Sequence, residues 1–160
     1  MVGQQSYATT FETGTVTRWI RRVTLIATAV LSAILLASYP LLPDLIPTHF
    51  NLAGEADGYG PSWTVFVIGG LLCALICATA WLSTRPQVLN FPVVVTQENS
   101  QLIFRESERM MVWVSASLLI AYVGTAISIW GGFGAPAFIA GILGLVLATI
   151  VGVKRTLSAA

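Results

Sequence analysis

Charged residues are scarce in this sequence, and their scarcity excludes a water-soluble fold for most of the chain. They make up 9% of the 160 residues, against 56% hydrophobic residues, whereas a soluble domain carries about a quarter charged residues. The sequence also has no basic patch with interleaved aromatic residues, and a net charge of +1 does not indicate nucleic-acid binding. We therefore expect the lipid bilayer as the solvent and no nucleic-acid partner.

Ionisable residues are missing from the depth of the four long apolar segments, which argues against several classes of membrane protein. Transporters, proton pumps and voltage sensors usually need a charge near the membrane midplane. Intramembrane proteases need carboxylates or a nucleophile with a base, yet Ser32, Ser115, Ser117 and Ser128 have no His or Asp partner in these segments. We expect a protein that is neither an enzyme nor a transporter and that needs no cofactor.

Lys and Arg are missing from two of the connections between the apolar segments, and this absence predicts the topology. All eight basic residues precede the first segment, lie between the second and third, or follow the fourth: Arg18, Arg21, Arg22, Arg85, Arg105, Arg109, Lys154 and Arg155. Basic residues favour the cytoplasmic side of a membrane. The pattern therefore predicts an all-α membrane protein with four transmembrane helices and both termini in the cytoplasm.

The expected elements divide the chain into a cytoplasmic tail, residues 1–17, and a four-helix membrane domain, residues 18–160. The helices are expected at about 19–39, 62–83, 111–130 and 135–153, each close to the roughly 20 residues that span a bilayer. All five tryptophans lie at or near predicted helix ends, as in an aromatic belt: Trp19, Trp63, Trp81, Trp113 and Trp130. An outer loop (40–61) and an inner loop (84–110) connect the helices.

Small residues recur at every fourth position along the predicted helices. Such stripes let helix backbones approach closely where lipid offers no hydrophobic driving force for contact. In the second and fourth helices they include Gly70, Ala74, Ala140, Gly144 and Ala148. The stripes favour packing within the bundle, and self-association of the fourth helix into a homo-oligomer is the alternative.

The inner loop is predicted to be extended at first and helical later. Pro86 and Pro92 favour an extended segment up to residue 95. Thr96 is a plausible helix N-cap, followed by a helical segment, residues 97–110, that continues into the third helix. The charged side chains of this segment, which include Glu106 and Glu108, are expected to form a solvated face.

The outer loop carries the only histidine and three of the seven acidic residues. Its prolines and glycines predict a compact cap, with turns at Gly54 and at Asp57-Gly58. One interpretation is a structural network in which His49 forms a hydrogen bond with Asp57 or Asp44. The other is a divalent metal site formed by His49, Asp57 and Asp44, because imidazole and carboxylates suit zinc.

This loop also carries a resemblance to a known family. The strings Leu42-Pro43-Asp44, Ile46-Pro47-Thr48-His49-Phe50-Asn51, Gly54 and Asp57-Gly58-Tyr59-Gly60 resemble the signature of a bacterial membrane domain of unknown function. That domain forms the N-terminal part of SdpI-type immunity proteins, which protect cells from their own secreted killing peptide. The segment Phe91-Pro92-Val93, with Thr96 and Glu98-Asn99, resembles the inner loop of stand-alone members.

The resemblance implies a multi-pass protein of the bacterial inner membrane that senses or blocks a peptide or envelope stress at the outer face. It implies a sensing loop that includes Asp44, His49, Asn51, Asp57 and Gly58, with a secreted peptide or another membrane protein as partner. The alternative function is a small accessory or assembly subunit of a larger membrane complex, which the small-residue stripes fit equally well.

Overall fold

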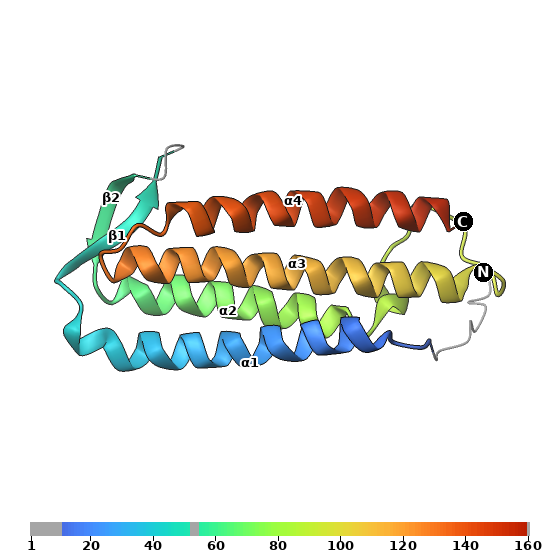
Figure 1. The fold of residues 1–160 in the computed structure, drawn as a ribbon, viewed down its shortest axis with the longest axis horizontal. Coiled ribbons are helices and arrows are strands. Elements are labelled where there is room, and N and C mark those ends of the chain that lie inside the picture. Colours follow the sequence, from blue (N-terminus) through green and yellow to red (C-terminus); the bar gives the residue numbers. More distant parts are fainter. Residues whose placement is uncertain (1–10, 52–54, 160) are drawn as a thin grey trace, which may run out of the picture.

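The computed structural model describes residues 11–51 and 55–159, which form a helical bundle with a small sheet at one end (Figure 1). The elements in chain order are α1 (Thr15–Ser38), η1 (Tyr39–Leu41), β1 (Leu45–Phe50), β2 (Ala56–Pro61), α2 (Thr64–Leu82), η2 (Pro86–Val88), α3 (Ser100–Ile129) and α4 (Ala135–Ser158). All four α-helices are long and apolar enough to cross a membrane, which indicates a multi-pass membrane protein.

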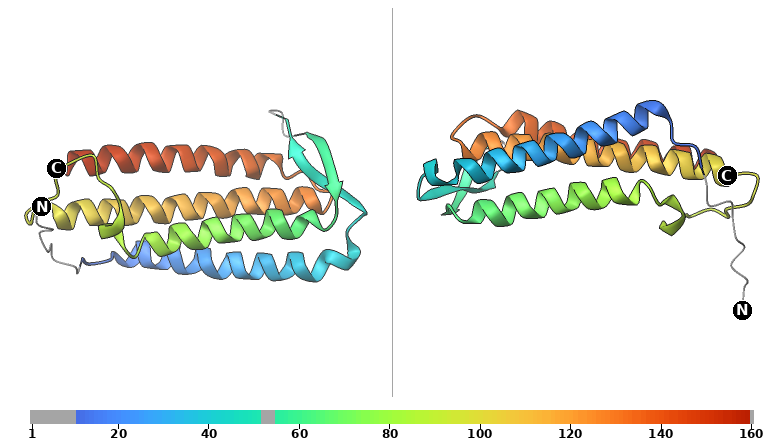
Figure 2. Two further views of the ribbon diagram at one scale, coloured as in Figure 1. Left: turned by 180° about the vertical axis from the view of Figure 1, so that it is seen from behind. Right: turned by 90° about the horizontal axis from the view of Figure 1, so that it is seen from below.

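The helix α3 lies at the centre of the bundle. It packs against α1, α2 and α4, whereas α4 packs mainly along α3 (Figures 1 and 2). The start of α1 and the end of α4 lie at one end of the bundle, here called the terminal end. The strands, η1 and the turn between α3 and α4 lie at the other, here called the hairpin end.

The interior of the bundle is rich in hydroxyl groups, while large apolar side chains cover its outside. Three of the four buried residues of α1 are threonines, Thr17, Thr24 and Thr28. Thr28 donates a hydrogen bond to the Thr24 carbonyl oxygen (2.8 Å), and the buried Tyr122 hydroxyl lies 3.2 Å from Ser32 Oγ. This distribution suits a lipid solvent, because polar groups must then find partners inside the protein.

The hairpin end corrects the all-α prediction. Strands β1 and β2 pair in an antiparallel hairpin, with irregular register around His49. Asp57 and Gly58, which we expected in a turn, lie in β2, and the expected turn at Gly54 lies outside the described residues. Ile46 anchors the hairpin, because it is fully buried in the cluster that includes Leu35 and Val65.

The helix boundaries also differ from those expected. Helix α1 begins at Thr15, so the tail is shorter than 1–17, and α4 continues to Ser158. The helical segment before the third membrane helix is confirmed, since α3 is one continuous helix. Thr96 and Asn99 form the turn before it: each backbone N–H donates to the other's side-chain oxygen, at 2.7 and 3.3 Å. This reciprocal pair resembles a capping box.

The expectation of a solvated charged face at the start of α3 is wrong for Glu106 and Glu108, whereas Glu98 and Arg105 are exposed. The Glu108 side chain is fully buried and accepts a hydrogen bond from Arg21 Nη1 (2.9 Å). The same Arg21 nitrogen lies 3.3 Å from Ser83 Oγ, just beyond α2. Glu106 is 16% exposed and pairs with Arg109 (2.6 Å). At the terminal end, one ion pair therefore connects α1, the end of α2 and α3.

Candidate functional site

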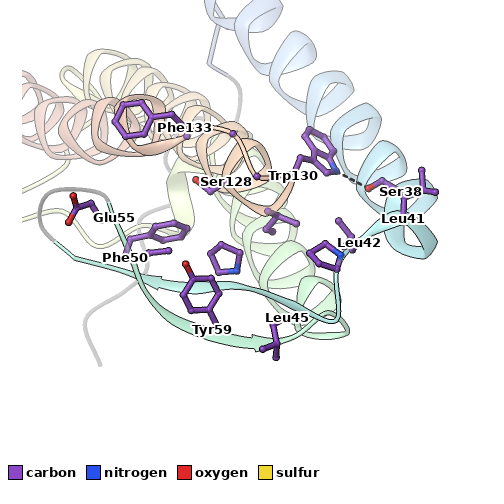
Figure 3. A pocket seen from close by; sticks show the side chains of 17 residues that line it. Ser38, Leu41, Leu42, Leu45, Phe50, Glu55, Tyr59, Ser128, Trp130 and Phe133 are labelled. Atoms are coloured by element: carbon purple, nitrogen blue, oxygen red, sulfur yellow. Dashed lines mark hydrogen bonds between the residues drawn. The ribbon is translucent and has the colours of Figure 1, made fainter.

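A cleft of about 590 Å³ opens at the hairpin end, between the hairpin and the helix ends (Figure 3). Three separate parts of the chain form its walls. The segment after α1 contributes Leu41 and Leu42, the hairpin contributes Phe50 and Tyr59, and the α3–α4 turn contributes residues 130–134. The lining is mainly apolar and aromatic, which is the character of most ligand-binding pockets.

Two contacts hold the walls of the cleft in place. Trp130 Nε1 donates a hydrogen bond to Ser38 Oγ (2.9 Å), which joins the end of α3 to the end of α1 (Figure 3). The ring of Phe50 contacts that of Phe138 in α4, with centroids 6.4 Å apart. One contact therefore joins α3 to α1 at the opening of the cleft, and the other joins the hairpin to α4.

The structure brings His49 and Asp57 together on the hairpin. Their side chains meet at 2.5 Å (Nδ1 to Oδ1), but they are 72% and 44% exposed. Gly58 explains the close pairing of the strands, since a Cβ at this position would lie 2.9 Å from His49 Cβ. These three residues do not line the cleft, so they brace its hairpin wall from outside.

Asn51 and Glu55 close the hairpin at its far end. The Glu55 backbone N–H donates to Asn51 Oδ1 (3.0 Å), and Asn51 Nδ2 donates to Glu55 Oε2 (3.2 Å). These bonds place the Glu55 side chain at the cleft. Asp44 acts through its backbone, because its carbonyl oxygen accepts a hydrogen bond from Ser62 N–H (2.9 Å) and so continues the strand pairing.

The metal interpretation gains no support from this geometry. Among residues 11–51 and 55–159, no three His, Cys, Asp or Glu side chains are grouped as a metal site would require. Asp57 holds the His49 ring, and Asp44 does not join them in such a group. A single imidazole with one carboxylate falls short of the three or four protein ligands that zinc usually has.

Sequence reasoning did not identify the aromatic residues of the α3–α4 turn as part of the site. Trp130 was interpreted only as a belt residue, and Phe133 was not considered. A signal was available, because the predicted topology places this turn on the same side of the membrane as the outer loop. Two connections on one side of a small bundle must lie close together, so the turn could have been included.

The small-residue stripes are placed differently in the two helices. A Cβ at Gly144 would lie 2.8 Å from Ser117 Oγ, so this glycine lies at the α3–α4 contact. Gly70, Ala74 and Ala140 are exposed, and a Cβ at Gly70 would meet no described atom within 4 Å. The prediction of packing within the bundle is therefore wrong for these three. Ala148 is half-buried and lines a groove between α3 and α4.

The closest approach of α3 and α4 depends on glycines that the stripes did not include. A Cβ at Gly124 would lie 2.3 Å from the Phe138 backbone nitrogen, and one at Gly141 would lie 2.4 Å from the Ala121 nitrogen. Backbone atoms cannot move aside as flexible side chains can. Gly131 in the connecting turn has φ +82°, a left-handed conformation that favours glycine.

A family model described as a domain of unknown function (DUF1648) matches residues 23–73. The chain therefore contains this domain, which runs from within α1 through η1 and the hairpin to the middle of α2. It supplies two of the three walls of the cleft, while the α3–α4 turn lies beyond it. No curated protein matches the chain, and no solved structure does.

Proposed function

We propose that this protein is a non-enzymatic, multi-pass protein of a bacterial inner membrane that senses or blocks a peptide at its outer face. The observation that carries the proposal is the apolar cleft at the hairpin end, between the hairpin and the ends of α1 and α3. The resemblance of the hairpin sequence to the signature of SdpI-type immunity proteins supports the same function.

The side chains around the cleft are unusually exposed for apolar residues. Leu41 is 86% exposed, Phe133 is 75% exposed and Tyr59 is 62% exposed. Lipid covers apolar side chains along the length of the helices, whereas in the proposed topology this end of the bundle meets headgroups or water. A contiguous apolar surface in such a place is typical of a site that a partner covers.

The charge around the cleft favours a cationic partner. The connections at this end, residues 39–61 and 130–134, contain three acidic residues and neither Lys nor Arg. Glu55 lies at the cleft itself. A peptide with positive charge and an apolar or aromatic side chain would match both the charge and the lining. Peptides secreted against bacterial membranes combine these two properties when they act on anionic lipid surfaces.

Helix α3 offers a physical route from the cleft to the terminal end. Ser128 and Ile129 line the cleft, and the same continuous helix begins in the inner loop, where Glu108 pairs with Arg21. A peptide that shifts the end of α3 would therefore act on this ion pair. The inner loop and the residues up to Arg109 would then transmit the peptide-bound state of the cleft to the terminal end, as expected for a sensing protein.

A deletion strain tests the proposal. Deletion should sensitise the cell to a cationic peptide in its surroundings, and the intact gene should restore growth. Tyr59→Ala and Phe133→Ala should abolish protection at normal protein levels, because they remove opposite walls of the cleft. Val16→Ala is the matched control, since Val16 is an apolar residue at the start of α1, is 72% exposed and does not line the cleft. Full protection by both cleft variants would refute the proposal.

The second candidate function, an accessory subunit of a membrane complex, rests on the exposed stripe of α2. Gly70 and Ala74 are exposed, and small residues at this spacing favour close contact with another helix. Affinity purification in mild detergent would recover the larger complex, and Ala74→Leu would remove it. Recovery of such a complex, with silent cleft variants, would establish this function instead.

A further inference from the structure

A second cavity, the α3–α4 groove, runs along the bundle at the terminal end and has a volume of about 550 Å³. Its mouth is charged and is formed by Glu106, Arg109 and Arg155. Its floor is apolar and narrow, because Gly144 and Ala148 bring α4 close to α3. The charged mouth and the apolar floor of the groove thus match the polar headgroup and the apolar tail of an amphiphilic molecule.

The length of the groove fits one leaflet of a membrane. From Arg155 to Gly144 the lining residues of α4 are eleven positions apart, which corresponds to about 16 Å of helix. Half of a hydrocarbon core that is about 30 Å thick is of the same size. Trp113, which is 54% exposed, lines the groove one turn above Arg109, at a depth that suits the membrane interface.

The mouth of the groove has one hydrogen-bond acceptor without a partner among the described residues, Glu106 Oε2, and one exposed donor group, the Arg155 guanidinium. Arg109 Nη1 donates to Glu106 Oε1 (2.6 Å), but Glu106 Oε2 is buried and has no hydrogen-bond partner in the described part of the chain. Arg155 Nη1 lies 3.8 Å from that oxygen, which is too far for a hydrogen bond. Arg155 is 60% exposed, so its guanidinium can reach another group.

We propose that the α3–α4 groove binds one phospholipid of the phosphatidylglycerol type. The phosphate accepts hydrogen bonds from Arg155, and a hydroxyl of the glycerol headgroup donates to Glu106 Oε2. Two arginines and one glutamate leave a single net positive charge, which matches the single negative charge of this lipid. The headgroup of phosphatidylethanolamine has a hydrogen-bond donor but no net charge. That of phosphatidylcholine has no hydrogen-bond donor and no net charge. An acyl chain lies along Ala148 toward Gly144. Basic pockets between membrane helices hold anionic headgroups in this way.

Native mass spectrometry of the purified full chain in detergent tests the headgroup. With phosphatidylglycerol, phosphatidylethanolamine and phosphatidylcholine supplied in equal amounts, the bound species should be mainly the one-to-one phosphatidylglycerol complex. Arg155→Gln should weaken this binding about tenfold, the size expected for losing a hydrogen bond to a charged group. Lys154→Gln is the matched control, because it removes the same charge one residue earlier, outside the groove lining.

A second pair of variants tests the tail. Ala148→Phe fills the groove and should abolish the complex, whereas Ala140→Phe, at an exposed position outside the groove, should leave it unchanged. If Ala148→Phe does not fold, the Arg155 and Lys154 pair decides. Equal binding of the three lipids, equal loss in both charge variants, or a dimer that excludes lipid from the groove would each overturn the proposal.

Discussion

Removing the Glu108 carboxylate should destabilise the protein more than any change to its exposed charges. Glu108 is fully buried, and its partner Arg21 is 16% exposed. In Glu108→Ala the guanidinium would remain between α1 and α3 with only the contact to Ser83 Oγ. Breaking a buried ion pair by removing one partner costs about 3–5 kcal/mol.

The size of the effect can be measured as a change in melting temperature. For a chain of this length, 3–5 kcal/mol corresponds to a decrease in Tm of roughly 10 °C. Thermal unfolding of the detergent-purified protein, followed by circular dichroism, gives the value directly. Glu98→Ala is the control, because it removes an exposed carboxylate at the same end and should change stability by less than about 0.5 kcal/mol.

A double variant separates an ion pair from a mere loss of packing. Arg21→Met with Glu108→Leu replaces both charges by apolar side chains of similar volume, so it should be far less destabilised than the sum of the single variants. Additive losses, or a Glu108→Ala protein that melts like the wild type, would refute the assignment of this pair as the link between α1 and α3.

Three further predictions follow from the same structure. Gly124→Ala should cost about 1–3 kcal/mol because its Cβ would overlap the backbone of α4, whereas Gly70→Ala should not destabilise the protein; melting curves compare the two. His49→Ala and Asp57→Ala should each cost less than about 1 kcal/mol, because their pair is exposed, and the double variant should cost less than the sum. A reporter that is active only in the cytoplasm should work at the C-terminus and fail when inserted at Gly54; the opposite result would invert the proposed topology.

The helices could be predicted from sequence because the length of an apolar segment is a local property. Each of the four segments is long enough to cross a bilayer, whatever the rest of the chain does. The hairpin could not be predicted in the same way. Strand β2 contains two glycines and a proline, which are poor strand formers, and its pairing with β1 depends on contacts across the loop. Turn chemistry therefore suggested a turn at Asp57-Gly58, where tertiary structure forms a strand.

The inward faces of the helices were harder to predict than the helices themselves. Helix α2 is apolar on all sides, so its sequence does not show whether Gly69 or Gly70 faces the bundle. The structure places Gly69 against the Tyr122 hydroxyl. The burial of Glu108 was unpredictable for a similar reason, because its partner Arg21 lies 87 residues away. The site was found in part: the hairpin residues were identified, but the opposite wall of the cleft was not.

The central position of α3 has a consequence for biogenesis. Helices enter the membrane in chain order, and α1 and α2 bury much of their inner surface only when α3 arrives. Until Glu108 is synthesised, the hydroxyl-rich face of α1 and the Arg21 side chain therefore have no partner in α3. During that time they must stay in the translocon or at the membrane interface. Helix α4, which packs mainly along α3, joins a nearly complete assembly. A nascent chain should become resistant to protease once α3 has been released, before α4 has left the ribosome.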